Sequence, residues 1–188
     1  MAQNLAPLPQ PGLSIYPSYI ATKPETFVAK GRDAWSDKAS YLVSFATPTG
    51  EPGAPFLEIV EIEEEHQLQD NASGKTEYHG MRGDSVKAWG LKLKTGWTGT
   101  EYQLTINDAK AVYIHVIVQN KVQGADKGIL INGQPATTMK RHEAWKHVHR
   151  MDIINVAPGM DILLALGVNW IRQDKQKQDT KTTVAAAT

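Results

Sequence analysis

A long apolar segment in the last third of this 188-residue chain constrains its fold more than any other feature. "VAPGMDILLALGVNWIRQ", residues 156–173, follows a sequence that is mostly polar and rich in turn residues. Its Pro-Gly pair allows a helix to begin at Met160, and Asp161 supplies a negative charge that suits a helix N-terminus. Apolar residues up to Ile171 then cover the whole circumference of the predicted helix. A helix of this kind is buried on all sides.

Three environments could bury such a helix: a membrane, the interface with a partner, or the interior of the protein's own fold. A membrane span needs about 20 apolar residues for a hydrocarbon core of about 30 Å, whereas a helix over 160–171 rises only about 18 Å. We therefore expect no transmembrane span. Because the helix follows a series of predicted strands, we expect a closed sheet to enclose it, as in a β-barrel.

Short apolar runs alternate with turn residues from Tyr41 onward, which predicts antiparallel strands. The hairpin predicted over residues 87–106 has two apolar sets on one face: Trp89, Leu91 and Leu93, and Tyr102, Leu104 and Ile106. Residues 111–119 are β-branched and nearly continuous, which predicts a strand buried on both faces. Asn132-Gly133 predicts a type I′ turn. "PFLEIVEIEEEHQLQD", residues 55–70, fits neither period, and we predict a strand from its neighbours.

The two ends of the chain differ from the predicted domain of residues 25–173. Residues 1–24 are Pro-rich, which predicts an extended leader that is flexible or follows the surface, and they lack the pattern of a secretion signal. Residues 174–188 predict a flexible polar tail. The chain has no cysteine, so it has no disulfide framework and no thiolate nucleophile, and a reducing compartment suits it. We expect a cytoplasmic protein that can attach peripherally to a membrane.

The C-terminal segment resembles the ending of the tubby C-terminal-like superfamily, especially its LURP-one-related branch. "INVAPGMDILLALGVNWIR" is similar to the strand, "PG-x-D" junction and hydrophobic helix of that family, and "SYLVSFATPTG", "LQDNASGKTEYH" and "AWGLKLKTG" agree with it in order. The resemblance covers roughly residues 25–172. It implies a mainly β fold, a closed antiparallel β-barrel of about twelve strands that encloses a hydrophobic C-terminal α-helix, here residues 160–171. Phospholipid scramblases resemble the same segment, but the chain lacks their Cys-rich region and an Asp-x-Asp-x-Asp calcium loop.

"KRHEAWKHVHR", residues 140–150, is the densest cationic stretch. Its cations suit phosphate or anionic headgroups, although strand alternation would divide them between two faces, and a solvated loop is the alternative interpretation. Tubby proteins hold phosphoinositide headgroups in a Lys/Arg pocket, so the resemblance points to the same ligand chemistry. The predicted ligand-binding residues are Lys140, Arg141, His142, Trp145, Lys146, His147, His149 and Arg150, with Lys92 and Lys94 as a second contribution.

The sequence contains few signs of metal binding, catalysis or nucleic-acid binding. The histidines of residues 140–150 lack evident third and fourth metal ligands, so we predict no metal and no cofactor. The Glu63–Glu65 run predicts a solvated surface. A nucleophile elbow, a phosphate loop, an HExxH pair and a dinucleotide fingerprint are all missing from the sequence, which predicts a protein that is not an enzyme. The formal net charge of +0 argues against nucleic acid as a partner.

The sequence therefore predicts a non-catalytic protein that binds anionic phospholipid or phosphoinositide headgroups at a membrane surface. One alternative is a carbohydrate-binding or defence-type protein that uses exposed aromatics such as Trp97, which lies in a Gly-rich turn. Another is a scramblase-like lipid-handling protein, which would require residues 160–171 to reach lipid. A protein partner leaves no recognisable mark in the sequence.

Overall fold

A computed structural model describes residues 4–31, 40–60, 75–83, 86–96, 99–107, 116–123, 126–141 and 151–172. These ranges contain ten strands, a short 3-10 helix η1 (Pro17–Tyr19) and one α-helix over residues 162–172, which we call the apolar helix. The strands are β1 (Glu25–Gly31), β2 (Ser40–Ala46), β3 (Pro52–Val60), β4 (Lys75–Met81), β5 (Lys87–Gly96), β6 (Gly99–Ile106), β7 (Val116–Gln123), β8 (Asp126–Ile131), β9 (Gln134–Arg141) and β10 (Met151–Val156).

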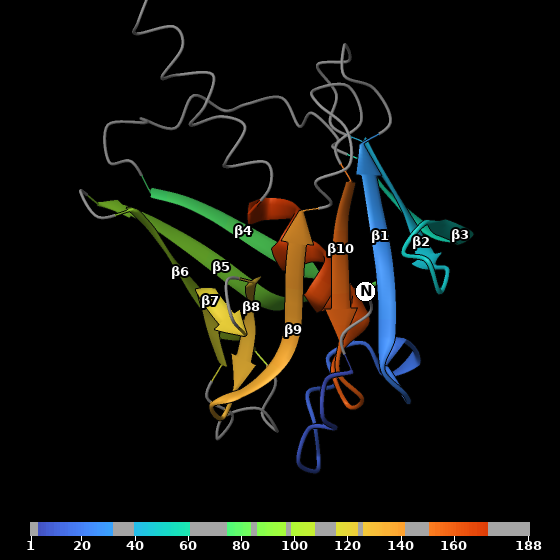
Figure 1. Ribbon diagram of the computed structural model, residues 1–188. Helices are drawn as coiled ribbons and strands as arrows, with labels where there is room; N and C mark the ends of the chain where they lie inside the picture. Colours follow the sequence, from blue (N-terminus) through green and yellow to red (C-terminus); the bar gives the residue numbers. More distant parts are fainter. Residues whose placement is uncertain are drawn as a thin grey trace, which may run out of the picture.

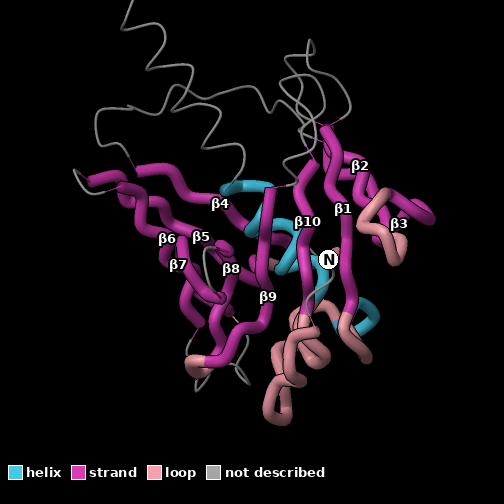
Figure 2. Tube along the Cα trace, viewed as in Figure 1, coloured by secondary structure: helices cyan, strands magenta, loops and turns pink. Residues whose placement is uncertain are grey.

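All ten strands belong to one antiparallel sheet with the order β3-β2-β1-β10-β9-β8-β7-β6-β5-β4. The sheet curves, and the apolar helix lies on its concave side (Figures 1 and 2). The mainly antiparallel β fold predicted from the sequence is thus confirmed. Within the described ranges no backbone pairing joins the edge strands β3 and β4, and ten strands are present where about twelve were expected. The closed barrel stays a prediction.

The predicted hairpins agree with the observed registers. In β5 and β6 the cross-strand pairs include Leu91 with Leu104 and Leu93 with Tyr102, as the alternation required. Asn132 has φ 50° and Gly133 has φ 81°, the two positive values that a type I′ turn between β8 and β9 needs. The ambiguous segment is a strand up to Val60, and its remainder lies outside the described residues. The strand predicted over 111–119 is described only from Val116.

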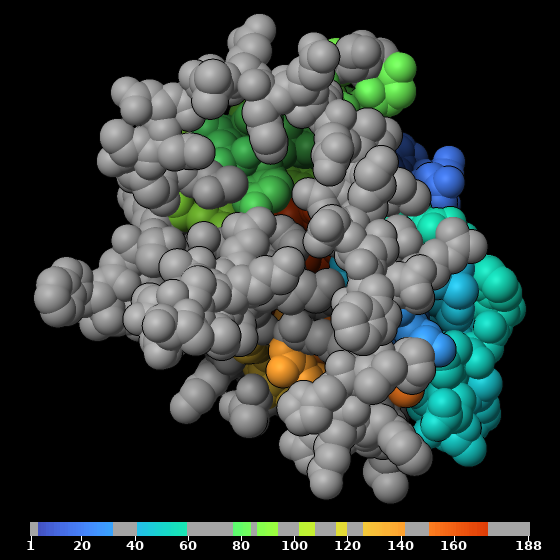
Figure 3. Space-filling view, turned by 90° about the horizontal axis from the view of Figure 1, so that it is seen from above, coloured from blue at the N-terminus to red at the C-terminus, as the bar shows by residue number. Residues whose placement is uncertain are grey.

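The apolar helix is buried over most of its circumference. Its buried apolar side chains are Ile162, Leu164, Ala165, Leu166, Val168 and Ile171. Asp161 forms the N-cap, because its Oδ1 accepts the backbone N–H of Leu164 at 3.0 Å. The helix therefore begins at residue 162, two residues later than predicted. Seen from above, part of the helix is visible as a small dark red area beside the green strand residues (Figure 3). No helix in the described ranges is both long enough and apolar enough to cross a membrane.

Trp89 joins the apolar helix to the β4–β5 pair. A Cβ atom built on Gly80 would lie 2.7 Å from Cδ1 of Trp89, and one built on Gly167 of the helix would lie 3.3 Å from Cζ2 of the same ring. Gly80 is also the cross-strand partner of Trp89. The indole thus fills the space left by two glycines, one on a strand and one on the helix, and this close approach fixes where the helix lies against the sheet.

The leader is predicted to be a flexible arm or to follow the surface, and the structure differs from this prediction. Five of its apolar side chains belong to the hydrophobic core: Leu5, Leu8, Leu13, Ile15 and Ala21. In Figure 1 this segment, drawn in dark blue, lies below the lower ends of β1 and β10. Because a Pro-rich segment bonds little with itself, its backbone groups are free to pair with the junction that precedes the helix.

The leader and the junction of residues 158–161 are joined by backbone hydrogen bonds. Leu13 donates to the carbonyl of Gly159 at 2.9 Å, and Ala21 donates to Met160 and accepts from Gly159. Gly12 lies against this junction so closely that a Cβ there would be 2.5 Å from the carbonyl oxygen of Gly159. These contacts give hydrogen-bond partners to carbonyl and N–H groups of the junction that precedes the helix.

The carboxylate of Asp161 completes this arrangement. Its Oδ2 accepts the N–H of Ile15 at 2.9 Å and of Tyr16 at 2.6 Å, while its Oδ1 caps the helix. Burial raises the pKa of Asp161, and the hydrogen bonds from Leu164, Tyr16 and Ile15 oppose that effect. One side chain therefore ties the leader to the first turn of the apolar helix.

Candidate functional site

The structure describes four of the ten predicted ligand-binding residues. Lys140 and Arg141 are the last two residues of β9, and Lys92 and Lys94 lie in β5. The other six lie outside the described residues: His142, Trp145, Lys146, His147, His149 and Arg150.

The described lysines of β5 are not brought to the end of β9. Strands β8, β7 and β6 separate β9 from β5. Four steps of about 4.8 Å between strands place β9 and β5 on the order of 19 Å apart along the sheet. Lys92 also has a partner on its own face, because its Nζ lies 3.5 Å from Oε2 of Glu77. The expected second contribution from β5 therefore does not join Arg141 in one site.

Lys140 and Arg141 lie on opposite faces of the sheet, since successive strand residues alternate. Arg141 is paired with Asp152 of β10, and two residues earlier Met139 is paired with Ile154. Met139 and Ile154 are both core residues, so Arg141 and Asp152 share the concave face that holds the apolar helix. Lys140 is exposed on the convex face. The two cations therefore lie on opposite faces of the sheet, and ligand binding by either of them stays a prediction.

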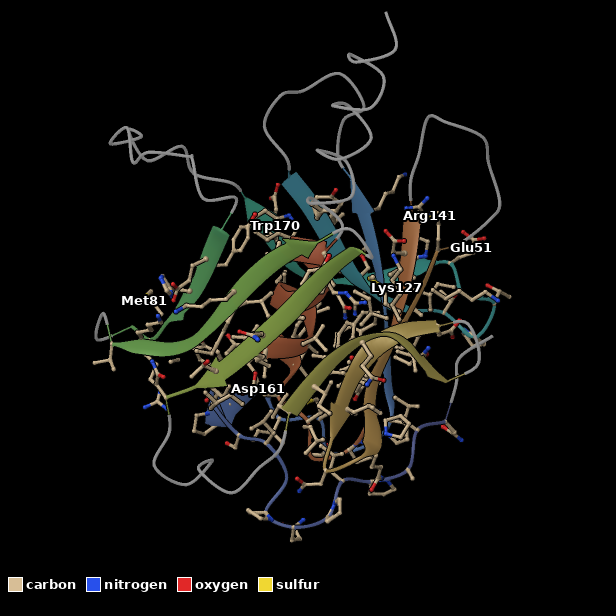
Figure 4. The ribbon with its side chains drawn as sticks, turned by 90° about the vertical axis from the view of Figure 1, so that its left-hand side faces the viewer. Glu51, Met81, Lys127, Arg141, Asp161 and Trp170 are labelled. Carbon is tan, nitrogen blue, oxygen red and sulfur yellow. The ribbon has the colours of Figure 1, made fainter. Side chains whose placement is uncertain are left out.

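Arg141 instead belongs to a group of charged side chains on the concave face. We call Lys127, Arg141, Asp152 and Arg172 the inner cationic cluster. Lys127 of β8 is paired with Met139, which places it on the same face as Arg141 (Figure 4). The Nε of Arg141 lies 4.0 Å from Oδ1 of Asp152. Arg172, the last described residue of the apolar helix, completes the group.

Arg172 is 1% exposed, and several contacts fix the position of its buried guanidinium group. Its Nη1 donates to the carbonyl of Gly128 at 3.2 Å and its Nη2 donates to the carbonyl of Gln119 at 2.7 Å. Its guanidinium also lies over the ring of Tyr102, 5.2 Å from the ring centre. Burial lowers the pKa of Arg172 to about 10, against the opposing effect of Tyr102. Arg172 therefore supplies a fixed positive charge to the interior of the curved sheet.

The positive charge of Arg172 affects the pKa of Lys127. Burial lowers the pKa of its ammonium group, and the positive charges of Arg172 and Arg141 lower it further, while Asp152 raises it. The inner cationic cluster thus combines three cations with one carboxylate. Like charges held together in a partly buried place are stabilised by an added anion, so the cluster can bind phosphate or carboxylate.

Sequence reasoning missed Lys127 and Arg172, although the sequence contained a signal for each. In "DKGILI" the alternation that places Ile129 and Ile131 on the core face also places Lys127 there. Arg172 directly follows the predicted buried helix of residues 160–171, and continuing that helix by one residue would have placed it in the interior. Neither residue lies in a dense cationic stretch, which is why a search for charge density passed over them.

The described residues add no group of side chains to the metal-binding or carbohydrate-binding alternatives. In the ranges that the structure covers, no three His, Asp or Glu side chains gather as metal ligands would. Trp97 lies outside the described residues, and Trp89 is buried. The carbohydrate-binding alternative stays a prediction.

Comparisons with known proteins add the following. The sequence matches no family model and no curated protein. A search of solved structures finds the X-ray structure of protein AT5G01750 from Arabidopsis thaliana, with 11% sequence identity and a TM-score of 0.46. That match covers 88% of this chain and 99% of the Arabidopsis chain.

Proposed function

We propose that this protein is a non-catalytic binding protein for anionic, phosphate-bearing lipid headgroups, such as those of anionic phospholipids and phosphoinositides. The observation that supports the proposal is the inner cationic cluster, in which the positive charges of both Arg172 and Arg141 act on Lys127. A phosphate oxygen accepts charge-assisted hydrogen bonds from guanidinium and ammonium groups.

The roles of the cations follow from their exposure. Arg172 is buried and bonded to two backbone carbonyls, so it contributes charge and does not need to touch the ligand. The side chain of Arg141 is 56% exposed, and Lys127 is half-buried, so both can contact a headgroup that approaches this end of the sheet. We assign first contact to Arg141 and Lys127, and a supporting electrostatic role to Arg172.

We propose further that the chain is a member of the tubby-like superfamily, with a sheet that closes into a barrel, and that it acts at the cytoplasmic surface of a membrane. The support is the order of elements at its C-terminal end. Strand β10 leads into Pro158-Gly159, then into the capping residue Asp161 and the apolar helix inside the curved sheet. This order matches the strand, "PG-x-D" junction and enclosed helix of the family.

Flotation with liposomes tests the proposal. The chain is mixed with vesicles of phosphatidylcholine alone, or with added phosphatidylserine or phosphoinositide, at low and high salt. We expect binding only to the anionic vesicles and weaker binding at high salt. Lys127→Ala and Arg141→Ala should each weaken binding about tenfold or more, because each removes a hydrogen bond to a charged group.

Lys140→Ala is the matched control, since Lys140 neighbours Arg141 on β9 but lies on the convex face. We expect it to bind as the unchanged protein does. If Lys127→Ala and Arg141→Ala fold normally and bind as well as Lys140→Ala, the inner cationic cluster is not the site. Binding to neutral vesicles that survives high salt would instead favour the scramblase-like alternative.

A further inference from the structure

The leader crosses the lower end of the curved sheet and touches strands that are far apart in the strand order. Near its start, the side-chain amide of Gln134 on β9 donates to the carbonyls of Ala6 at 3.2 Å and Pro7 at 2.9 Å. Leu8 then donates to the carbonyl of Pro158 in the junction at 2.9 Å. The leader is thus attached first to the middle of the sheet, below β9 and β10 (Figure 1).

The short helix η1 carries the leader on to the two edge strands. The hydroxyl of Tyr16, the N-cap residue of η1, donates to the carbonyl of Met81 at 3.1 Å, and Met81 is the last residue of the edge strand β4. The ring of Tyr19 meets the ring of Phe56 on the edge strand β3 edge to face, with 6.4 Å between the ring centroids. Two contacts three positions apart in the leader therefore reach both edges of the sheet.

The two edges have no direct strand pairing with each other in the part of the sheet that the structure describes. Strands β4 and β3 stand at opposite ends of the strand order, where β4 pairs with β5 and β3 pairs with β2. An edge strand opens more readily than a central strand, because backbone bonds hold it on one side. The contacts of η1 therefore join two strands that could otherwise open separately.

Each contact of η1 is connected to a well-packed part of the fold. The backbone N–H of Tyr16 donates to Oδ2 of Asp161 at 2.6 Å, so the residue that reaches β4 is also bonded to the buried cap of the apolar helix. Phe56 packs on Phe27 and Phe45, with ring centroids 5.1 Å and 5.2 Å away, which extends the aromatic contact into β1 and β2. A displacement of one edge is therefore transmitted through η1 to the other edge.

We propose that the leader is a strap that holds the two edges of the sheet, β3 and β4, together around the N-terminal end of the apolar helix. While the strap is in place, the edges are coupled through Tyr16 and Tyr19. When it is released, the edges open independently and the first turn of the helix is uncovered. The backbone of the strap meets the junction through isolated bridges at Leu13 and Ile20, so it can separate without breaking a strand ladder. This role is independent of the ligand that the protein binds.

Hydrogen exchange of the full chain, followed by mass spectrometry of peptides from β3, β4 and β8–β9, tests the coupling. Tyr16→Phe removes the hydroxyl that reaches β4, and Tyr19→Ala removes the ring that reaches β3. We expect each variant to speed exchange about two- to tenfold in both β3 and β4, because a single contact of this kind changes an opening equilibrium by that factor. Exchange in β8 and β9 should stay the same. Ser18→Ala is the matched control, since Ser18 lies on η1 between the two tyrosines and is exposed.

The decisive result is the effect of each variant on the distant edge. If Tyr16→Phe speeds exchange in β4 alone and Tyr19→Ala in β3 alone, the contacts are local and the leader is not a strap. The proposal also fails if neither variant differs from Ser18→Ala. Circular dichroism checks that both variants are folded. If Tyr19→Ala is not, Tyr16→Phe decides alone, because it keeps the ring: faster exchange in β3 then supports the strap, and unchanged exchange in β3 overturns it.

Discussion

The contact between Gly80 and Trp89 gives the sharpest test of how the apolar helix is held. In Gly80→Ala the added methyl group would overlap Nε1 and Cε2 of the Trp89 ring, so the ring must retreat by roughly 1.5 Å or more to reach an ordinary contact. Gly167 of the helix stands on another side of the ring, where a Cβ would be only 3.3 Å from Cζ2. The indole therefore has little room to move.

Overpacking of this kind costs about 1–3 kcal/mol, and replacing glycine by alanine regains ~0.4–1 kcal/mol from the unfolded chain. We expect Gly80→Ala to lower the free energy of unfolding by about 1–2 kcal/mol. Urea unfolding followed by circular dichroism measures this, with an unchanged slope as the sign of two-state behaviour. Gly83→Ala is the control, because a Cβ at Gly83 would have no neighbour within 4 Å among the described residues.

A double-mutant cycle tests whether the loss of stability in Gly80→Ala comes from the contact with Trp89. In the Trp89→Leu background the ring is absent, so adding Gly80→Ala should cost nothing measurable. The reasoning is refuted if Gly80→Ala is as stable as Gly83→Ala, or if it costs the same with and without the indole. Either result would mean that the helix is not positioned through this contact.

Three further predictions concern the apolar helix and the inner cationic cluster. Asp161→Ala removes the acceptor of three backbone N–H groups, so it should destabilise the fold by about 1–3 kcal/mol and expose the leader to protease. A leader that resists protease as well as in the unchanged protein would contradict the role of this carboxylate. Asn169→Leu replaces a buried amide by an apolar side chain of similar size and should raise the free energy of unfolding by about 1–3 kcal/mol, whereas a loss would reveal a partner for the amide. Phosphate affinity should fall as the pH rises through the lowered pKa of Lys127, because the ammonium group loses its proton there. Lys127→Arg should keep its phosphate affinity over the same pH range. An identical decline in both proteins would exclude Lys127 as the cause.

Much of the fold could be predicted from patterns that depend on neighbouring residues alone. The β5–β6 register follows from alternation, and the Asn132-Gly133 turn follows from the need for positive φ. The buried helix follows from apolar residues on all its sides. These features were predictable because each is determined within a short stretch of sequence.

The leader and the site were not predictable in the same way, because both depend on distant pairing. Prolines indicated an extended backbone, but nothing local showed that Leu13 and Ala21 would bond to residues 159 and 160. The cationic stretch of 140–150 included Arg141 among its predicted ligand-binding residues. Its actual neighbours, Lys127 and Arg172, come from β8 and from the helix, and only the sheet order brings them together.

The apolar helix separates stability from binding along its length. At its first turn Asp161 joins the leader to the helix, and at residue 172 the helix reaches the inner cationic cluster (Figure 4). About 16 Å of helix lies between these ends, at 1.5 Å per residue. Substitutions that far apart and without shared partners act independently. Asp161→Ala should therefore lower stability while leaving phosphate affinity within about twofold, and Lys127→Ala should do the reverse. If Asp161→Ala weakens phosphate binding in a fully folded sample, the helix transmits its position from one end to the other, and the two ends act as one unit.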